Sequence, residues 1–149
     1  MLTIELPSAG DGSLNEYGYV LLVALWLTFH CYLNGFVVVE YKRAKTYTSD
    51  YLKKNYWEEH HAAFPNDKMV PKFGYPDMGT GYYSSKLSYK QWFEFNVAQR
   101  IHQNFLESLI IVVLLTLVAG LKYPAVTVYL GLAYSFGRLV NAIGYTMKT

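Results

Sequence analysis

Four polar side chains at the start of a strongly apolar segment could bind a charged ligand or pair with other helices. Arg100, Asn104 and Glu107 stand at positions i, i+4 and i+7, so a helix would place them on one narrow face, with Gln103 beside them. Ionisable residues inside a bilayer nearly always face a protein interior or a wet cavity. We call these four residues the polar stripe.

The last apolar segment carries a similar row at i, i+4, i+7 and i+11, formed by Tyr134, Arg138, Asn141 and Tyr145. Arg100 and Arg138 against the single carboxylate of Glu107 leave one surplus positive charge. Such a site suits an anionic, carboxylate-bearing ligand held by bidentate contacts. The alternative is an interhelical ion pair between Arg138 and Glu107, with the amide side chains of the polar stripe as hydrogen-bonding partners.

Three stretches are long and apolar enough to cross a bilayer. Residues 17–39 contain no Asp, Glu, Lys or Arg, and as a helix they would cover about 35 Å. The other two span about residues 95–120 and 123–145, and Pro124 lies in the first turn of the last. Aromatic residues expected at headgroup depth stand near the ends of the spans: Tyr17, Tyr19, Trp92, Phe93, Tyr123 and Tyr145. The sequence therefore predicts an all-α integral membrane protein, a bundle of three transmembrane helices.

The polar segment between the first two spans, residues 40–94, shows no clear helical or alternating periodicity and is predicted to be a long loop. It contains nine Lys and Arg residues, whereas the arm before Tyr17 contains none, and Lys148 follows the third span. The positive-inside rule then predicts an outer N-terminus, with the long loop and the C-terminus inside. Because a structureless loop of this length is uncommon in a compact domain, we expect it to contact other membrane-protein subunits.

The segment FNVAQRIHQNFLE at residues 95–107 resembles the signature of the membrane-associated proteins in eicosanoid and glutathione metabolism, the MAPEG family. It is most similar to the microsomal glutathione S-transferase 3 branch. EYGYVLL at residues 16–22 and GLAYSFGRLVNAIGY at residues 131–145 resemble the first and third helices of that branch. The resemblance thus predicts a single MAPEG-like membrane domain over residues 1–149.

The resemblance implies a helical bundle that trimerises, with glutathione bound between neighbouring subunits inside the membrane. Arg100, Asn104 and Glu107 match the motif positions that hold the charged ends of the tripeptide. Arg138 and Tyr145 match positions on the third helix. Glutathione would then occupy a notch open to lipid, where apolar electrophiles dissolve.

Several departures from the family pattern count against that chemistry. Family members have four helices, whereas this chain stops at Thr149, so the fourth helix and a thiolate-stabilising arginine are expected to be absent. Asn141 stands where some relatives carry tyrosine, and Ser108 stands where the leukotriene-forming members place tyrosine. The segment 40–94 is also far longer than the usual connection.

Two functional hypotheses therefore stay open. The favoured one is a non-catalytic accessory subunit of a larger membrane complex, with a mitochondrial respiratory complex as one setting. The alternative is a glutathione transferase or peroxidase, a homotrimer that conjugates glutathione to lipophilic electrophiles. No catalytic residue is assigned under either hypothesis, and a mitochondrial membrane is favoured over the endoplasmic reticulum.

The remaining signals point away from other classes of protein. The formal charge of +2 is small and scattered, and no zinc-finger spacing is present, so nucleic acid is not an expected partner. Residues 58–61 (EEHH) are predicted to be a solvated loop rather than a metal site, because adjacent side chains point in different directions. The single Cys31 is predicted to be a buried thiol, and His30 and Asn34 to form interhelical hydrogen bonds.

Overall fold

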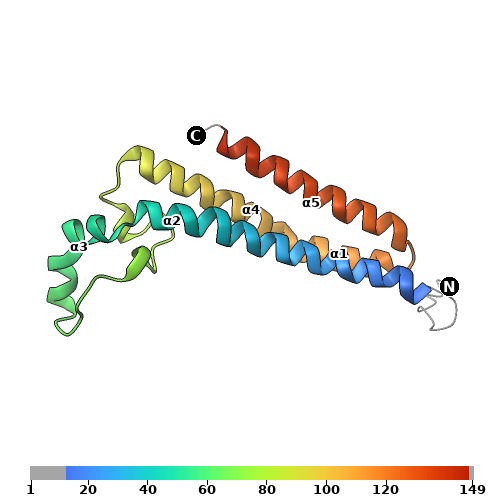
Figure 1. Ribbon diagram of the computed structural model, residues 1–149, viewed down its shortest axis with the longest axis horizontal. Helices are drawn as coiled ribbons and strands as arrows, with labels where there is room; N and C mark the ends of the chain where they lie inside the picture. The colour runs from blue at the N-terminus through green and yellow to red at the C-terminus, as the bar shows by residue number, and fades with distance from the viewer. Residues whose placement is uncertain (1–12, 148–149) are drawn as a thin grey trace. The chain divides into compact units, whose positions relative to one another are not determined.

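The computed structural model describes residues 13–147, and all the regular elements within that range are helical (Figure 1). In chain order they are α1 (Ser13–Leu33), the π-helical η1 (Asn34–Glu40), α2 (Tyr41–Thr46), α3 (Ser49–Ala63), the 3₁₀ turns η2 (Lys72–Gly74) and η3 (Tyr82–Ser84), α4 (Tyr89–Gly120) and α5 (Pro124–Thr146). Lys148, which the topology prediction used, lies outside the described residues.

Three helical spans are long and apolar enough to cross a membrane: Glu16–Thr46, Tyr89–Gly120 and Pro124–Thr146. The first combines α1, η1 and α2, which follow one another without a break. The prediction of an all-α integral membrane protein with three spans is therefore confirmed. The first span ends seven residues later than predicted, at Thr46 rather than 39, and α4 begins at Tyr89 rather than about 95.

The prediction of a long loop over residues 40–94 is wrong, because α2, α3, two 3₁₀ turns and the first turns of α4 lie within it. Thr48 caps the start of α3, where its side chain accepts a hydrogen bond from the backbone N–H of Tyr51 (3.3 Å), and Asp50 stands in the first turn. Only Leu52 and Tyr56 of this helix are buried. A helix with a single buried i, i+4 pair has too weak an apolar stripe for its periodicity to be recognised.

The described chain divides into two compact units. The first contains residues 13–33 and 103–147, and the second contains residues 34–102, so α4 contributes to both. Each unit has its own buried cluster and is described by itself.

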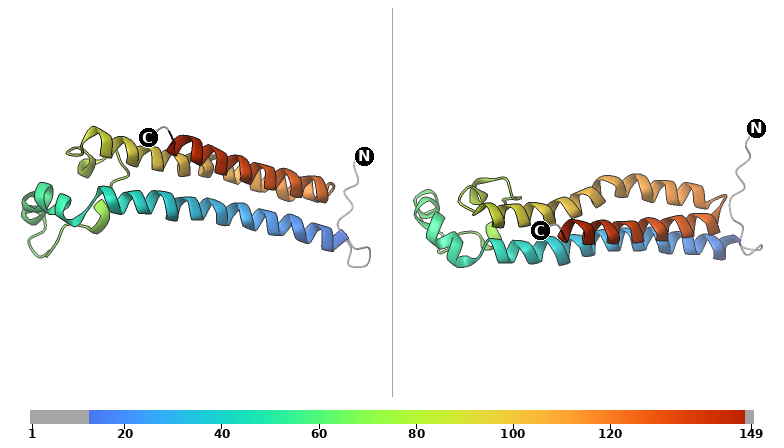
Figure 2. Two further views of the ribbon diagram at one scale, coloured as in Figure 1. Left: turned by 45° about the horizontal axis from the view of Figure 1, so that its top comes forward. Right: turned by 90° about the horizontal axis from the view of Figure 1, so that it is seen from above.

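The first unit is built on close packing of α1 against α5, which run alongside each other (Figure 2). Its core contains residues of α1 and α4, namely Val23, Leu27, Cys31, Phe105 and Leu109. Gly131 lies so close to α1 that a Cβ atom would overlap the side chain of Val23. Small residues of this kind let transmembrane helices approach closely. Cys31 is buried, as predicted.

The second unit has a core rich in tyrosine: Val39, Tyr47, Leu52, Tyr56, Val70 and Phe95. The tyrosine hydroxyls find partners within the unit. Tyr47 bonds with the Ser84 hydroxyl (2.5 Å), and Tyr51 donates to the backbone carbonyl of Tyr83 (2.7 Å). Burial raises the pKa of Tyr47 to about 12, so its hydroxyl stays protonated and can donate. Tyrosine therefore supplies apolar ring surface while its polar end is satisfied.

Candidate functional site

The polar stripe lies on α4, and its helical register keeps Arg100, Asn104 and Glu107 on one face. Arg100, Gln103 and Glu107 are exposed in the isolated chain, and Asn104 is half-buried. Glu107 precedes the end of α4 at Gly120 by 13 residues, which is about 20 Å along the helix axis. Since the hydrocarbon core of a bilayer is about 30 Å thick, the Glu107 carboxylate stands at membrane depth.

Arg138 is held by two hydroxyl groups and two aromatic rings of the first unit. Its Nε donates to the Tyr134 hydroxyl (2.9 Å), and a terminal guanidinium nitrogen donates to the hydroxyl of Ser108 on α4. The hydroxyls of Ser108 and Tyr134 are themselves 2.6 Å apart. The Arg138 Cζ atom lies 5.5 Å from the ring centroid of Phe105 and 5.0 Å from that of Tyr134, within cation–π range. We call these four residues the Arg138 cluster.

The Arg138 cluster was only partly predictable. Arg138 and Tyr134 stand one helical turn apart, and this spacing signalled a shared face. Ser108 was noted only as a departure from the family pattern, although it directly follows Glu107. No sequence feature signalled the contact of Arg138 with the Phe105 ring, because it depends on the rotation of α4 against α5.

A second polar contact joins α1 to α5. The indole N–H of Trp26 donates to the hydroxyl oxygen of Ser135 (2.9 Å). The same oxygen lies 2.9 Å from Nδ1 of His30, so the Ser135 hydroxyl can donate its own hydrogen to that nitrogen. The His30 ring also meets the Phe105 ring edge-on, with centroids 5.1 Å apart. His30 is therefore an interhelical hydrogen-bonding residue, as predicted. Asn34 is buried at the start of η1, and its interhelical bond stays a prediction.

The other residues of the predicted third-helix row do not join the Arg138 cluster. Asn141 and Tyr145 are exposed on α5, three and seven residues beyond Arg138. Arg138 itself contacts Ser108, Tyr134 and Phe105. The structure thus brings Arg138 together with Tyr134, whereas Tyr145 stays apart.

The EEHH segment lies on α3 rather than in a solvated loop, which corrects that part of the prediction. Its side chains engage different neighbours. His60 Nε2 lies 3.1 Å from the Asp67 carboxylate, whereas Glu59 accepts from the Tyr82 hydroxyl (2.7 Å) and from Lys86 (3.2 Å). These hydrogen bonds lower the pKa of Glu59. The two side chains therefore do not converge on one point.

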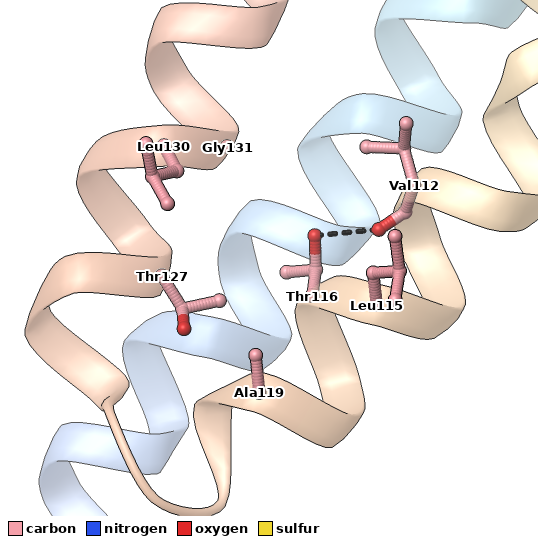
Figure 3. Close-up of a pocket in the computed structure, with 7 residues that line it drawn as sticks. All are labelled: Val112, Leu115, Thr116, Ala119, Thr127, Leu130 and Gly131. Atoms are coloured by element: carbon pink, nitrogen blue, oxygen red, sulfur yellow. Dashed lines mark hydrogen bonds between the residues drawn. The ribbon is translucent and has the colours of Figure 1, made fainter.

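A small cavity in the first unit lies between α4 and α5, with a volume of about 180 Å³ (Figure 3). Its walls are Val112, Leu115, Thr116, Ala119, Thr127, Leu130 and Gly131. The Thr116 hydroxyl donates to the Val112 carbonyl (2.7 Å) and is thus engaged within its own helix. None of the lining side chains is charged. This cavity suits an apolar group and offers nothing to the charged ends of a peptide.

In a comparison with protein families, the chain matches the MAPEG family over residues 17–149. No curated protein and no solved structure matches the chain. The matched range begins one residue into the first membrane span and includes the other two spans, the polar stripe and the Arg138 cluster. The chain therefore belongs to the MAPEG family.

Proposed function

We propose that this MAPEG protein is a non-catalytic subunit of a larger membrane assembly, in which neighbouring membrane-protein subunits cover the polar stripe. The observation that carries the proposal is the exposure of Arg100, Gln103 and Glu107 on a helix that is long and apolar enough to cross a membrane. A charged side chain at membrane depth is unfavourable when it contacts lipid and is stabilised when it contacts protein. Neighbouring subunits would supply that protein surface.

The contacts of Arg138 support a structural role for the polar side chains. Its guanidinium donates to hydroxyls of its own chain and lies against two rings of the same unit. These contacts tie α4 to α5, as polar side chains commonly do between transmembrane helices. Removing one partner of such a cluster strands the others, so it persists even where no ligand is bound.

The second unit supports the proposal through the surface that it adds. Residues 47–88 lie between the first two spans and contain the folded helix α3. The tyrosine-rich core holds this segment in a defined shape. A fixed surface of this kind can bind neighbouring subunits. A mitochondrial membrane remains the favoured location, and the endoplasmic reticulum remains the alternative.

The alternative function is that of a glutathione transferase or peroxidase. It is favoured by the shared face of Arg100, Asn104 and Glu107, the positions that the family resemblance assigns to glutathione binding. In a homotrimer, a neighbouring copy of the chain and the bound tripeptide would together cover the stripe. Closeness to the microsomal glutathione S-transferase 3 branch stays part of this alternative.

The two functions differ in particle size, ligand binding and turnover. The native membrane is extracted in a mild detergent, and particle size is measured together with glutathione binding and conjugation of a lipophilic electrophile. The subunit proposal predicts a particle far larger than a homotrimer, with neither glutathione binding nor turnover.

Arg100→Ala tests the stripe, and Ile110→Ala, at an exposed apolar position of α4, is the matched control. Glutathione binding that Arg100→Ala weakens and Ile110→Ala does not, together with turnover, would refute the subunit proposal and establish the alternative.

A further inference from the structure

The segment from Lys72 to Gly79 in the second unit buries the charged side chain of Asp77 and exposes large apolar side chains, together with Lys72. Asp77 is 5% exposed, and Arg43, which contacts the segment from α2, is 1% exposed. In contrast, Phe73 is 48%, Tyr75 43% and Met78 61% exposed. Charged groups are rarely buried and large apolar groups usually are, so this arrangement is the reverse of the usual one. We call these eight residues the 72–79 segment.

Arg43 fixes the shape of the 72–79 segment from the inside. Its guanidinium donates to the backbone carbonyl of Asp77 (2.6 Å) and approaches that of Phe73 (3.5 Å). The Arg43 Cζ atom also lies 4.3 Å from the Tyr75 ring centroid and 5.1 Å from that of Phe95. The inner face of the Tyr75 ring is thus occupied by Arg43, and its outer face is left exposed.

The Asp77 carboxylate binds the backbone at the end of the 72–79 segment and just beyond it. It accepts hydrogen bonds from the backbone N–H groups of Gly79 (2.7 Å), Gly81 (3.0 Å) and Ser84 (2.8 Å), and from the Ser84 hydroxyl (2.9 Å). Burial alone would raise the pKa of Asp77, but these hydrogen bonds outweigh it and lower the pKa below its usual value. The carboxylate is therefore a fixed acceptor around which the backbone folds.

The segment is also fastened to α4. The side-chain amide of Asn96 donates to the Gly79 carbonyl (2.9 Å), and that of Gln99 donates to the Met78 carbonyl (3.1 Å). With Arg43, which lies three residues before the end of the first membrane span at Thr46, the 72–79 segment is attached to both membrane-spanning helices of this unit. Its exposed side chains are consequently held in place beside these two helices.

Phe73 has a backbone conformation that a non-glycine residue seldom adopts. Its φ is 58°, in the left-handed region, and Gly74 follows with φ 66°. A phenylalanine there is unfavourable, and its half-exposed ring would be unfavourable again in water. The exposure of the ring is explained if it lies in an apolar environment that the isolated chain lacks.

The length of α4 identifies that environment. With 32 residues, or about 48 Å of helix, α4 is longer than a hydrocarbon core of about 30 Å, so its first turns, which belong to the second unit, reach headgroup depth. The 72–79 segment is bonded to α4 at Asn96 and to α2 at Arg43, three residues before the first span ends at Thr46. Aromatic rings beside a lysine are the side chains favoured at that depth, and Lys72 adjoins Phe73. We propose that the 72–79 segment is a lipid-binding surface that inserts Phe73, Tyr75 and Met78 into the membrane interface.

The proposal is tested by spin labels attached to single cysteines in the full-length chain. Cys31 is the only cysteine, so Cys31→Ser supplies a cysteine-free background. Met78→Cys and, separately, Phe73→Cys carry the label, and the protein is reconstituted in vesicles of phosphatidylcholine and phosphatidylserine. Collision with oxygen, which concentrates in lipid, is compared with collision with a water-soluble nickel chelate.

Phe64→Cys is the matched control, because Phe64 is also an exposed aromatic residue (57%) but stands at the end of α3. Labels at positions 73 and 78 should collide more with oxygen than with nickel, and the label at 64 should show the reverse. Equal nickel access at 64, 73 and 78 would overturn the proposal. Shielding of 73 and 78 from both agents would also overturn it and would indicate a protein partner. These outcomes are independent of the proposed subunit function.

Discussion

At the scale of single residues, the Arg138 cluster can be tested by removing one hydroxyl group, that of Ser108. It accepts from Arg138 and lies 2.6 Å from the Tyr134 hydroxyl. We expect Ser108→Ala to lower the free energy of unfolding by about 1 kcal/mol, since interhelical hydrogen bonds in membranes contribute on this order. Thermal unfolding in detergent, followed by circular dichroism, measures the change.

Thr116→Val is the control for Ser108→Ala. It also removes a hydroxyl from α4, but that group donates only within its own helix, to the Val112 carbonyl. The control should unfold at the wild-type temperature or above it, because such back-bonding slightly destabilises helices. An equal loss of stability in the two variants would show that the contacts between α4 and α5 do not depend on the Ser108 hydroxyl.

The Asp77 carboxylate predicts a pH dependence in the second unit. Its pKa is lowered from the usual value of 3.8, so the folded state favours the ionised form. Its contribution to stability is therefore complete above pH 3.8 and is lost as the pH falls through the lowered pKa. The stability difference between wild type and Asp77→Asn should be constant near neutral pH and should shrink in acid. A difference that stays constant down to the lowest pH would contradict this assignment.

At the scale of elements, the apolar spans were predictable and the second unit was not. A segment such as 17–39 can be recognised without knowledge of its neighbours, because its length and lack of charge suffice. Helix α3 buries only Leu52 and Tyr56, and the second unit folds around long-range contacts such as that of Arg43 with Asp77. No local sequence pattern encodes contacts of that kind.

In the candidate site too, some features were predictable from the sequence and others were not. The register of Arg100, Asn104 and Glu107 follows from the helical period alone, as does the pairing of Tyr134 with Arg138 on α5. Which residue of α4 meets Arg138 depends on how the two helices rotate about their axes. The hydrogen bonds of the cluster lead to Ser108, the neighbour of Glu107, and the ion pair of Arg138 with Glu107 stays a prediction.

The contact of α1 with α5 predicts a size limit at position 131. A Cβ atom at Gly131 would overlap the Val23 side chain, so Gly131→Ala should lower the free energy of unfolding by about 1–3 kcal/mol through overpacking. Gly137→Ala is the control on the same helix, because nothing lies within 4 Å of its Cβ position. The control should be neutral or slightly stabilising, since alanine favours helix over glycine. Thermal unfolding of both variants separates the packing effect from helix propensity.

At the scale of the whole molecule, exposed charged residues stand on the apolar helix α4. What surrounds this helix determines how the chain responds when one of these charges is removed. Glu107 is exposed at membrane depth on the isolated chain. If neighbouring subunits cover it, their polar groups have been arranged around a carboxylate. Replacing it with an apolar residue would then leave those groups buried without a partner, at a cost of about 1–3 kcal/mol for each group.

Glu107→Leu is therefore expected to reduce the amount of chain recovered in the large particle, measured by native gel electrophoresis of detergent extracts. Ile110→Leu, one turn further along α4, is exposed and apolar before and after the change, and it should leave assembly intact. Recovery of Glu107→Leu in the large particle at the wild-type level would contradict the proposal that neighbouring subunits cover this position.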